Sequence, residues 1–289
     1  MSINILVTGA KGQLGKTLKD ESLILKDKYS FMFATKAELD ITEQTQIEVF
    51  LKKKEYHYCI NCSAYTNVEQ AEEFPELAFR VNAEAVKNLA TACKKTNTVL
   101  IHISTDYVFD GTKSKPYLET DRPNPINTYG RSKLQGEKYI QDILENYFII
   151  RASWLYSKYG KNFLKTIIKK IKQDERLNII SSQTGTPTSC IDLSKFIFQI
   201  ITTRNASYGI YNFSAKGNAT WYDYALLIAK HFPEYNSSKI IPVKNFASKA
   251  ARPSYSVLDN TKSQQIMPNQ RSWQKSIDEV ITHSGQLIG

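Results

Sequence analysis

The chain has 289 residues, 42% of them hydrophobic and 23% charged, which is enough for one large α/β domain or two smaller ones with hydrophobic cores. Lysine and arginine exceed aspartate and glutamate by ten, which favours anionic partners, but no nucleic-acid-binding motif accompanies this charge and we predict no such partner. No apolar run approaches the roughly 20 residues of a membrane span, and a strand that begins at Ile3 leaves no room for a signal peptide, which predicts a cytoplasmic protein.

The first half of the chain alternates short β-branched segments with longer amphipathic ones. Strands are predicted at residues 3–8, 31–34, 58–61, 98–104 and 148–152, with helices at 13–25, 45–54, 76–95 and 129–145. A series of this kind predicts an α/β fold with a doubly wound, Rossmann-like parallel sheet covered by helices on both faces. We therefore expect a dinucleotide-binding domain over residues 1–150.

After residue 150 the alternation loosens, and glycine and proline residues divide the chain into shorter segments. Residues 151–289 are expected to form mainly a smaller second region. One regular helix, near residues 191–203, is expected to return to the first domain.

A glycine-rich loop follows the first strand and opens a helix: Thr8-Gly9-Ala10-Lys11-Gly12-Gln13-Leu14-Gly15. Glycines allow the tight turn and the close approach to a pyrophosphate, which then faces the helix N-terminus. An ordinary strand-to-helix turn is the alternative, but the position at the first strand of a βαβ series favours a dinucleotide site. The predicted cofactor contacts in this loop are Gly9, Lys11, Gly12, Gln13, Leu14 and Gly15.

The residues after the second strand decide which dinucleotide binds. NAD-binding folds place an acidic residue there for the ribose 2′-hydroxyl, whereas this chain has Thr35-Lys36. A cation suits a 2′-phosphate, so we predict NADPH, bound by Lys36 with help from Lys11, and leave NADH open; the alternative is that Lys36 is an ordinary surface lysine. Asp40, followed by Ile41, is predicted either to accept a hydrogen bond from the adenine amino group or to cap the next helix.

The segment Asn127-Thr128-Tyr129-Gly130-Arg131-Ser132-Lys133 carries the sharpest chemical signal. Tyr129 and Lys133 are four residues apart and share one face of a helix. A lysine ammonium beside the phenol is expected to lower the pKa of Tyr129 and make it a proton donor. The fourth strand ends at Ser104-Thr105, whose hydroxyls are suited to bind a carbonyl oxygen as it gains charge. A plain helix pair and a helix cap are the alternative interpretations, and the order of these pieces after a nucleotide loop favours catalysis.

The four cysteines, at 59, 62, 93 and 190, are predicted to be reduced and buried, because Cys59-Ile60-Asn61-Cys62 lies in a strand and not at a helix start. The four histidines show no spacing typical of metal ligands, so no metal site is predicted.

These motifs resemble the extended short-chain dehydrogenase/reductase superfamily and, within it, the dTDP-4-dehydrorhamnose reductase family. The resemblance runs over most of the chain. Beyond the glycine loop and the Tyr129–Lys133 pair, it rests on the segments 61–72, 104–111, 151–156, 185–188 with 192–193, and 252–253. The string Ser-Thr-Asp-Tyr-Val-Phe at 104–109 is the part most specific to the family.

The resemblance implies an NADPH-dependent oxidoreductase of dTDP-rhamnose and polysaccharide biosynthesis, which reduces the C4 ketone of dTDP-4-dehydro-L-rhamnose to dTDP-L-rhamnose. Tyr129 would protonate the C4 oxygen, Lys133 would hold the nicotinamide ribose and tune Tyr129, and Thr105 would bind the C4 oxygen. Ala64 and Tyr65 would line the cofactor cleft. The second region would bind the substrate, with contacts from Ser104, Thr105, Asp106, Trp154 and Arg252.

Other functions are weighed against this one. A 4,6-dehydratase needs a further carboxylate, but Asp106 is followed by Tyr107. A reductase or epimerase of another nucleotide-linked keto sugar, and a non-catalytic nucleotide-sensing subunit, remain as alternatives. Some members of the family are metal-bridged dimers, whereas this tail offers only Asp278 and Glu279; Mg²⁺ and a homodimer are therefore left open.

Overall fold

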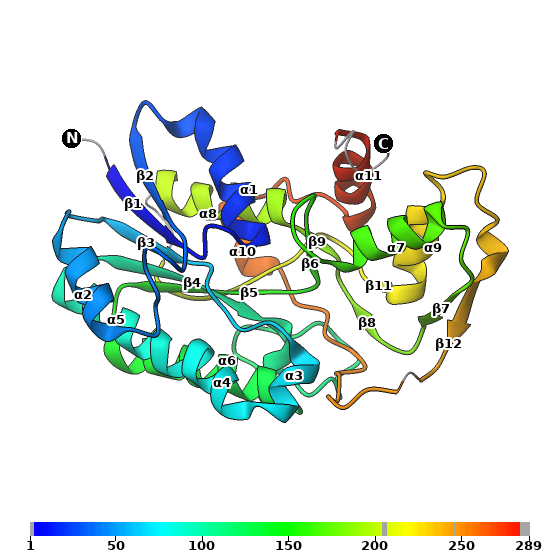
Figure 1. Ribbon diagram of the computed structural model, residues 1–289, viewed down its shortest axis with the longest axis horizontal. Coiled ribbons are helices and arrows are strands. Elements are labelled where there is room, and N and C mark those ends of the chain that lie inside the picture. The colour runs from blue at the N-terminus through cyan, green and yellow to red at the C-terminus, as the bar shows by residue number, and fades with distance from the viewer. Residues whose placement is uncertain (1–2, 204–206, 246, 284–289) are drawn as a thin grey trace.

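A parallel sheet organises the N-terminal part of the molecule. The computed structural model describes residues 3–203, 207–245 and 247–283, and within them this sheet has six strands in the order β10-β5-β4-β3-β1-β2 (Figure 1). All neighbouring strands are parallel. The strands are β1 (Ile3–Thr8), β2 (Tyr29–Ala34), β3 (Tyr58–Asn61), β4 (Val99–Thr105), β5 (Tyr147–Ala152) and β10 (Gly209–Phe213). The prediction of a doubly wound parallel sheet is confirmed.

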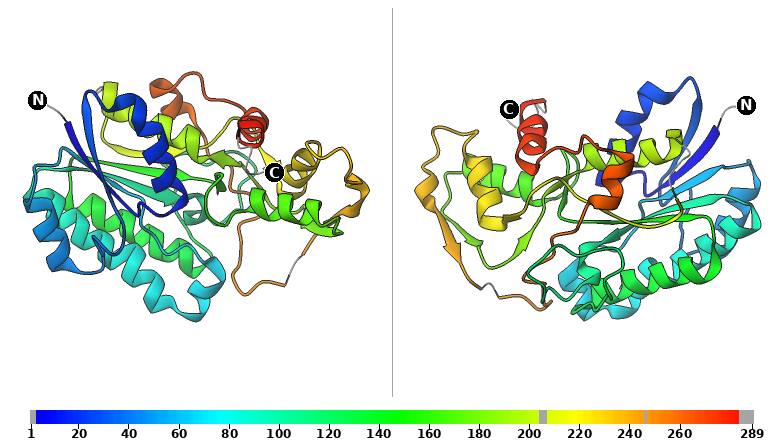
Figure 2. Two further views of the ribbon diagram at one scale, coloured as in Figure 1. Left: turned by 45° about the horizontal axis from the view of Figure 1, so that its top comes forward. Right: turned by 180° about the vertical axis from the view of Figure 1, so that it is seen from behind.

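Helices cover both faces of this sheet (Figure 2). On one face, α1 (Gln13–Glu21) packs against α8 (Cys190–Thr203), which comes from the C-terminal half of the chain. Their apolar side chains, among them Leu14, Leu18 and Phe196, share a core with β1 and β5. The other face carries α2 (Gln44–Lys52), α5 (Ala85–Lys95) and α6 (Thr128–Ile143). The short 3₁₀ helices η1 (Ser22–Leu25) and η3 (Asp106–Val108) follow α1 and β4.

The predicted helix at 76–95 is interrupted. The chain instead forms α3 (Val68–Glu73), α4 (Pro75–Phe79), a π-helical turn η2 (Arg80–Glu84) and then α5. Asn82 lies in this turn. Its side-chain oxygen accepts a hydrogen bond from the Tyr65 backbone N–H at 2.8 Å, and its NH₂ group donates one to the Tyr65 carbonyl oxygen at 2.9 Å. It also lies 3.0 Å from the Ser132 hydroxyl. The irregular turn therefore connects the loop after β3 to α6.

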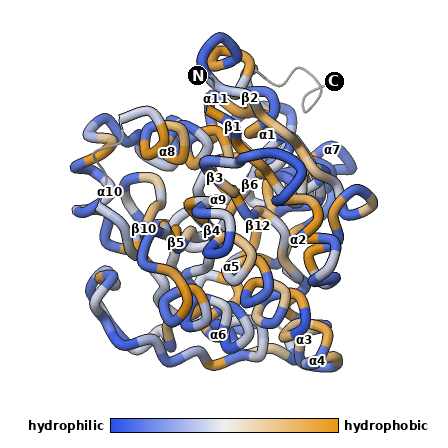
Figure 3. The backbone as a smooth tube through the Cα atoms, turned by 90° about the vertical axis from the view of Figure 1, so that its left-hand side faces the viewer, coloured by the Kyte–Doolittle hydropathy of each residue, from blue (hydrophilic) through white to orange (hydrophobic). Residues whose placement is uncertain are grey.

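A second hydrophobic core lies in the C-terminal region, where α7 (Phe163–Lys172), α9 (Trp221–Ala229) and α11 (Trp273–His283) contribute residues such as Leu164, Ile228 and Ile277. The hydropathy-coloured tube shows helices that alternate hydrophilic and hydrophobic stretches, as expected for helices that cover a core (Figure 3). Among the described residues, no helix has the length and apolar character needed to cross a membrane. The remaining elements are β6 (Leu155–Tyr156), α7 (Phe163–Lys172), β7 (Leu177–Ile180), β8 (Thr184–Gly185), β9 (Thr188–Ser189), β11 (Ala219–Thr220), α9 (Trp221–Ala229), η4 (Ser237–Lys239), β12 (Ile240–Val243), α10 (Thr261–Ile266) and α11 (Trp273–His283).

Candidate active site

A cavity of about 450 Å³ opens at the carboxyl ends of β1, β2 and β3. The strand order reverses here, because β1 lies between β2 and β3, and open α/β sheets bind ligands at such a switch point. The lining includes these residues predicted to contact the cofactor: Gly9, Lys11, Gly12, Lys36, Asp40, Ile41, Ala64 and Tyr65.

The glycine loop forms the floor of this cavity. Gly9 has a φ of +68°, in the left-handed region, and a Cβ atom there would lie 2.8 Å from the backbone of Cys62. Gly12 is the N-cap of α1, and no described side chain caps this helix end. The amide groups at the start of α1 are thus left for an anion, as in other phosphate-binding loops.

The remaining predicted members of the loop face away from the cavity. A Cβ atom on Gly15 would lie 2.5 Å from the Gly9 carbonyl oxygen, so this glycine allows α1 to start close to the loop. Leu14 is buried in the core. The side-chain oxygen of Gln13 accepts hydrogen bonds from Ser157 and Asn162, at 3.2 and 2.8 Å. Gln13 therefore connects the loop to the chain after β5.

Basic side chains gather at the β2 end of the cavity. Lys36 is exposed, with its ammonium 3.4 Å from the Asp40 carboxylate. Asp40 also accepts hydrogen bonds from the backbone and hydroxyl of Thr42, so it caps its own turn rather than helix α2. Arg80 lines the same cavity. Sequence reasoning missed Arg80, because its helix is adjacent to the cavity only in three dimensions.

Thr105 and Tyr129 meet at the carboxyl end of β4. Asn127 caps α6 by accepting a hydrogen bond from the Gly130 amide at 2.7 Å, which places Tyr129 in the first turn. A hydrogen bond between the Thr105 and Tyr129 side chains lowers the pKa of Tyr129, but burial has the larger effect and raises this pKa to about 12. The phenol is therefore protonated at neutral pH.

The predicted lowering of the Tyr129 pKa by Lys133 is wrong for this arrangement. The Lys133 side chain is buried, and its ammonium nitrogen contacts the Ile103 carbonyl oxygen at 2.6 Å and His102 Nε2 at 3.1 Å. Lys133 also faces Cys62, which lines the cavity after β3. The Lys133 side chain is therefore held against β4. Burial of the phenol, which raises the pKa of Tyr129, is the largest effect on that group.

Ser104 and Thr105 are neighbours in the chain, but their hydroxyls contact different groups. The Ser104 hydroxyl donates to the carboxylate of Glu137, which also forms a buried ion pair with Arg151 at 2.7 Å. Ser104 therefore lies in a polar network between β4, β5 and α6, apart from the Thr105–Tyr129 pair. The period-two alternation of a strand already separates the two residues.

Asp106 is almost fully buried. Its carboxylate accepts hydrogen bonds from the hydroxyls of Ser256, Ser153 and Thr105, at 2.6, 3.2 and 3.1 Å. Burial raises the pKa of Asp106 to about 6, against the opposite effect of these hydrogen bonds. Asp106 thus connects the predicted catalytic strand to the C-terminal region through Ser256.

Trp154 is positioned by the packing of its indole ring. The ring stacks on Trp221 with ring centroids 3.5 Å apart, and a Cβ atom on Gly185 would lie 2.5 Å from the same ring. Its backbone has a φ of +46°. The stack on Trp221 occupies one face of the ring, so the predicted contact with the substrate would use the rest of it.

Arg252 lies at another cavity, of about 280 Å³, lined by Phe163, Gln183 and Trp221 among others. Its guanidinium is 2.6 Å from the Glu69 carboxylate on α3. A hydrogen bond from Arg252 also acts on the Tyr107 phenol, whose pKa is raised chiefly by burial.

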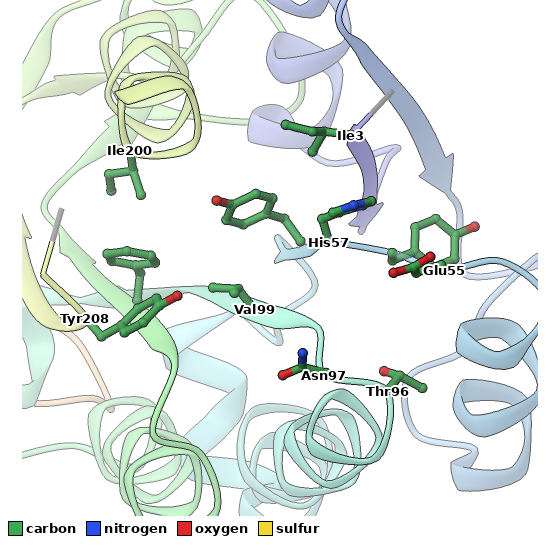
Figure 4. Close-up of a pocket in the computed structure, with 11 residues that line it drawn as sticks. Ile3, Glu55, His57, Thr96, Asn97, Val99, Ile200 and Tyr208 are labelled. Atoms are coloured by element: carbon green, nitrogen blue, oxygen red, sulfur yellow. The ribbon is translucent and has the colours of Figure 1, made fainter. Parts of the chain in front are cut away.

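A further cavity, of about 440 Å³, lies at the opposite, amino edge of the sheet (Figure 4). Its lining includes Ile3, His57, Val99 and Tyr208 and none of the residues predicted to bind cofactor or substrate.

In the described part of the chain, no group of histidine, cysteine, aspartate or glutamate side chains is arranged to hold a metal ion. The four cysteines are free, with Cys59, Cys93 and Cys190 buried and Cys62 partly buried.

The parallel sheet with an open helix N-terminus at its switch point is a Rossmann-like fold of the short-chain dehydrogenase/reductase type, and the relatives below show that the chain is an oxidoreductase. A family model described as the RmlD substrate binding domain matches residues 3–285. The chain belongs to this family, that of the dTDP-4-dehydrorhamnose reductases, as its motifs predicted.

Individual relatives agree with this assignment. A dTDP-4-dehydrorhamnose reductase of Aggregatibacter actinomycetemcomitans is 36% identical, over 96% of this chain and 97% of that protein. A dTDP-4-keto-6-deoxy-D-glucose reductase of Streptomyces niveus is 33% identical, over 88% of this chain and 87% of that protein. The crystal structure of a dTDP-4-dehydrorhamnose reductase from Bacillus anthracis in complex with NADP matches with a TM-score of 0.92 and 36% identity, over 98% of this chain and 100% of that one.

Proposed function

We propose that the protein reduces the C4 ketone of dTDP-4-dehydro-L-rhamnose to dTDP-L-rhamnose, with NADPH as the reductant. The observation that carries this proposal is that the side chains of Thr105, at the end of β4, and Tyr129, in the first turn of α6, face each other at the carboxyl edge of the sheet, where the cavity that suits a dinucleotide also opens. Family membership supports the choice of substrate class.

The fit of the dinucleotide rests on the cavity at the switch point. The start of α1 offers uncapped amides to a pyrophosphate, and Lys11, Lys36 and Arg80 surround the same cavity with positive charge. Cations at this position suit a 2′-phosphate, and the related Bacillus anthracis structure contains NADP. When bound, the dinucleotide supplies a hydride to C4 of the sugar.

Side chains of the protein would supply the proton that the C4 oxygen receives. Thr105 would turn its hydroxyl proton from the Asp106 carboxylate, which accepts it at 3.1 Å in the structure, to the C4 oxygen as negative charge develops on that oxygen. Tyr129, whose pKa of about 12 keeps the phenol protonated, would transfer its proton to this oxygen. Lys133 would hold the nicotinamide ribose and supply positive charge one helical turn from Tyr129. The substrate would receive further contacts from Trp154 and from Arg252. Asp106 is left out of the proposed contacts, because its buried carboxylate is engaged with Ser153 and Ser256.

Residues 151–289 would bind most of the nucleotide sugar. The cavity of about 280 Å³ next to Arg252 is apolar on the side of Phe163 and Trp221, and a guanidinium there matches a diphosphate. Ser104 is left out of the proposed contacts, because its hydroxyl is engaged with Glu137.

The central test is Tyr129→Phe. We expect kcat for NADPH-dependent reduction of dTDP-4-dehydro-L-rhamnose to fall by about 10²- to 10⁴-fold, because a general acid is removed. The affinity for NADPH, measured by the quenching of intrinsic fluorescence, is expected to stay within about twofold of the native value.

Two outcomes would contradict the proposal. An unchanged turnover of the phenylalanine variant excludes Tyr129 as the acid. If the native protein binds NADPH but does not turn over this sugar, the assignment of the cofactor site stands and the assignment of the substrate is wrong. The substrate would then be another nucleotide-linked keto sugar.

A further inference from the structure

A chain of buried polar groups lies beneath the proposed catalytic residues. His102, on β4, is fully buried. Its Nε2 is 3.1 Å from Lys133 Nζ and its Nδ1 is 3.1 Å from Asn61 Nδ2. Asn61, at the end of β3, in turn accepts a hydrogen bond from the Thr8 hydroxyl at 2.7 Å. These contacts connect Lys133 to the strand that precedes the glycine loop.

The orientation of the Asn61 amide follows from its surroundings. The backbone N–H of Ser63 lies 3.1 Å from Asn61 Oδ1, and a backbone amide can only donate. The atom that it contacts must therefore be the oxygen, which directs the NH₂ group of Asn61 toward His102.

The orientation of Asn61 decides the tautomer of His102. The NH₂ group of Asn61 only donates, so Nδ1 of His102 must accept and carries no proton. A doubly protonated ring is excluded for the same reason. His102 is therefore neutral with its proton on Nε2, which agrees with burial lowering the pKa of His102 well below its usual value.

The Nε2–H group of His102 faces the amine of Lys133. An ammonium has donors only, so it would meet this N–H donor to donor. A neutral amine has a lone pair that accepts from Nε2–H, while one of its own hydrogens still bonds the Ile103 carbonyl oxygen at 2.6 Å. The arrangement of these donors therefore destabilises the ammonium relative to the neutral amine and lowers the pH at which Lys133 loses its proton.

We propose that His102 is a positioning residue that holds the Lys133 amine through its Nε2–H group and, with its tautomer set by Asn61, makes the Lys133 ammonium easier to deprotonate. This inference deepens the proposed reductase chemistry and rests on it. His102 contacts Lys133 and would act on the proposed reaction only through that residue.

The proposal has a consequence for the dependence of turnover on pH. Burial lowers the pKa of Lys133 to about 8, while Glu137 on the same helix and Cys62 after β3 act in the opposite direction. Above this pH the ammonium is lost, and Lys133 has one donor fewer, and no positive charge, for the nicotinamide ribose that it would hold. Thr105 and Asp106 also face Tyr129 and are present in every variant compared below.

The test compares His102→Leu with His102→Gln. Leucine removes the contact that positions the Lys133 amine, so we expect kcat to fall about tenfold. It also removes the donor that destabilises the ammonium, so the alkaline limb of the kcat profile is expected to move to higher pH. The KM for the nucleotide sugar is expected to change by less than about twofold. Glutamine can accept from Asn61 through Oε1 and donate to Lys133 through Nε2, so it is expected to restore both kcat and the limb. His57→Gln, at the opposite edge of the sheet, is the control and is expected to behave as the native protein.

A folded leucine variant whose alkaline limb matches that of the native protein overturns the proposal, and so does a limb that moves to lower pH. If the leucine variant does not fold, ¹⁵N NMR of histidine-labelled native protein decides, with the His102 signal assigned from its loss in His102→Gln. We expect a neutral ring protonated on Nε2 that does not titrate between about pH 6 and 9. A proton on Nδ1, or a titration in this range, contradicts the proposal.

The NMR measurement needs no substrate. A failure of the proposed reductase function would therefore appear as absent turnover with the expected tautomer, whereas a failure of the present inference would appear as the wrong tautomer.

Discussion

Asp106 is a carboxyl group held inside the protein by the hydroxyls of Ser153 and Ser256. Its pKa rises from 3.8 to about 6 on folding, chiefly through burial. Between pH 3.8 and about 6, the Asp106 carboxyl is therefore protonated in the folded protein but ionised in the unfolded chain. The contribution of this group to the free energy of unfolding is fully present below about pH 4 and is lost as the pH rises through about 6.

Asp106→Asn is expected to remove this dependence. The neutral amide needs no proton, so the variant should exceed the native protein in free energy of unfolding by up to about 3 kcal/mol at pH 8, and by little near pH 4. Urea denaturation at the two pH values measures the difference. An equal difference at both would show that the Asp106 carboxyl does not titrate as described.

Lys36 belongs to the positive group around the proposed cofactor cavity, together with Lys11 and Arg80. Lys36→Glu places a negative charge beside the proposed 2′-phosphate, so we expect the KM for NADPH to rise about tenfold while that for NADH changes little. Lys138→Glu on α6 changes the net charge equally and is the control. Equal efficiency with NADPH and NADH, unaffected by Lys36→Glu, would contradict the assignment of this residue.

The helix α6 is joined to the sheet by a buried ion pair. Glu137 and Arg151 are both almost fully buried, with the guanidinium 2.7 Å from the carboxylate, and Ser104 donates to the same carboxylate. This pairing connects α6 to β4 and β5, the elements that carry Tyr129 and Thr105.

Glu137→Gln leaves the Arg151 guanidinium buried without its counter-charge. We expect the free energy of unfolding to fall by about 3 kcal/mol or more. Glu48→Gln, which breaks the more exposed pair with Lys95, is the control and should cost less than about 1 kcal/mol. Urea denaturation of both variants makes the comparison, and similar small losses would mean that the buried pair contributes no more than the exposed one.

The C-terminal region returns to the nucleotide-binding part through the segment 248–252 after β12 (Figure 1). Glu69 on α3 receives hydrogen bonds from the Ser248 hydroxyl at 2.6 Å, the Lys249 amide at 2.9 Å and the Arg252 guanidinium at 2.6 Å. Asn127, the cap of α6, bonds the Ala251 carbonyl oxygen at 2.8 Å. The segment thereby connects the two parts across the proposed substrate site.

Glu69→Ala is expected to loosen this segment without unfolding the protein. Exposed ion pairs contribute less than about 1 kcal/mol, so the thermal midpoint should change little, whereas trypsin should cleave after Lys249 several times faster than in the native protein. Glu76→Ala, on α4, is the matched control. Unchanged cleavage would show that the segment is held by its other contacts.

Local pattern in the sequence determined the elements of this protein. Alternating β-branched and amphipathic segments predicted the strands that form the sheet, and the glycines of residues 9–15 predicted the phosphate loop, because backbone freedom and side-chain period act over a few residues. The spacing of Tyr129 and Lys133 predicted a shared helix face for the same reason. The family followed from these strings together with the segment 104–109.

Only the tertiary structure decided what these side chains contact. Lys133 is held by His102 from the neighbouring strand, Trp154 is covered by Trp221 from a helix that begins 67 residues later, and Arg80 reaches the cofactor cavity from an irregular turn. These partners are distant in the chain, so no local periodicity encodes them. Burial, which sets the protonation of Tyr129, Asp106 and Lys133, likewise arises only when the sheet, the helices and the C-terminal region pack together.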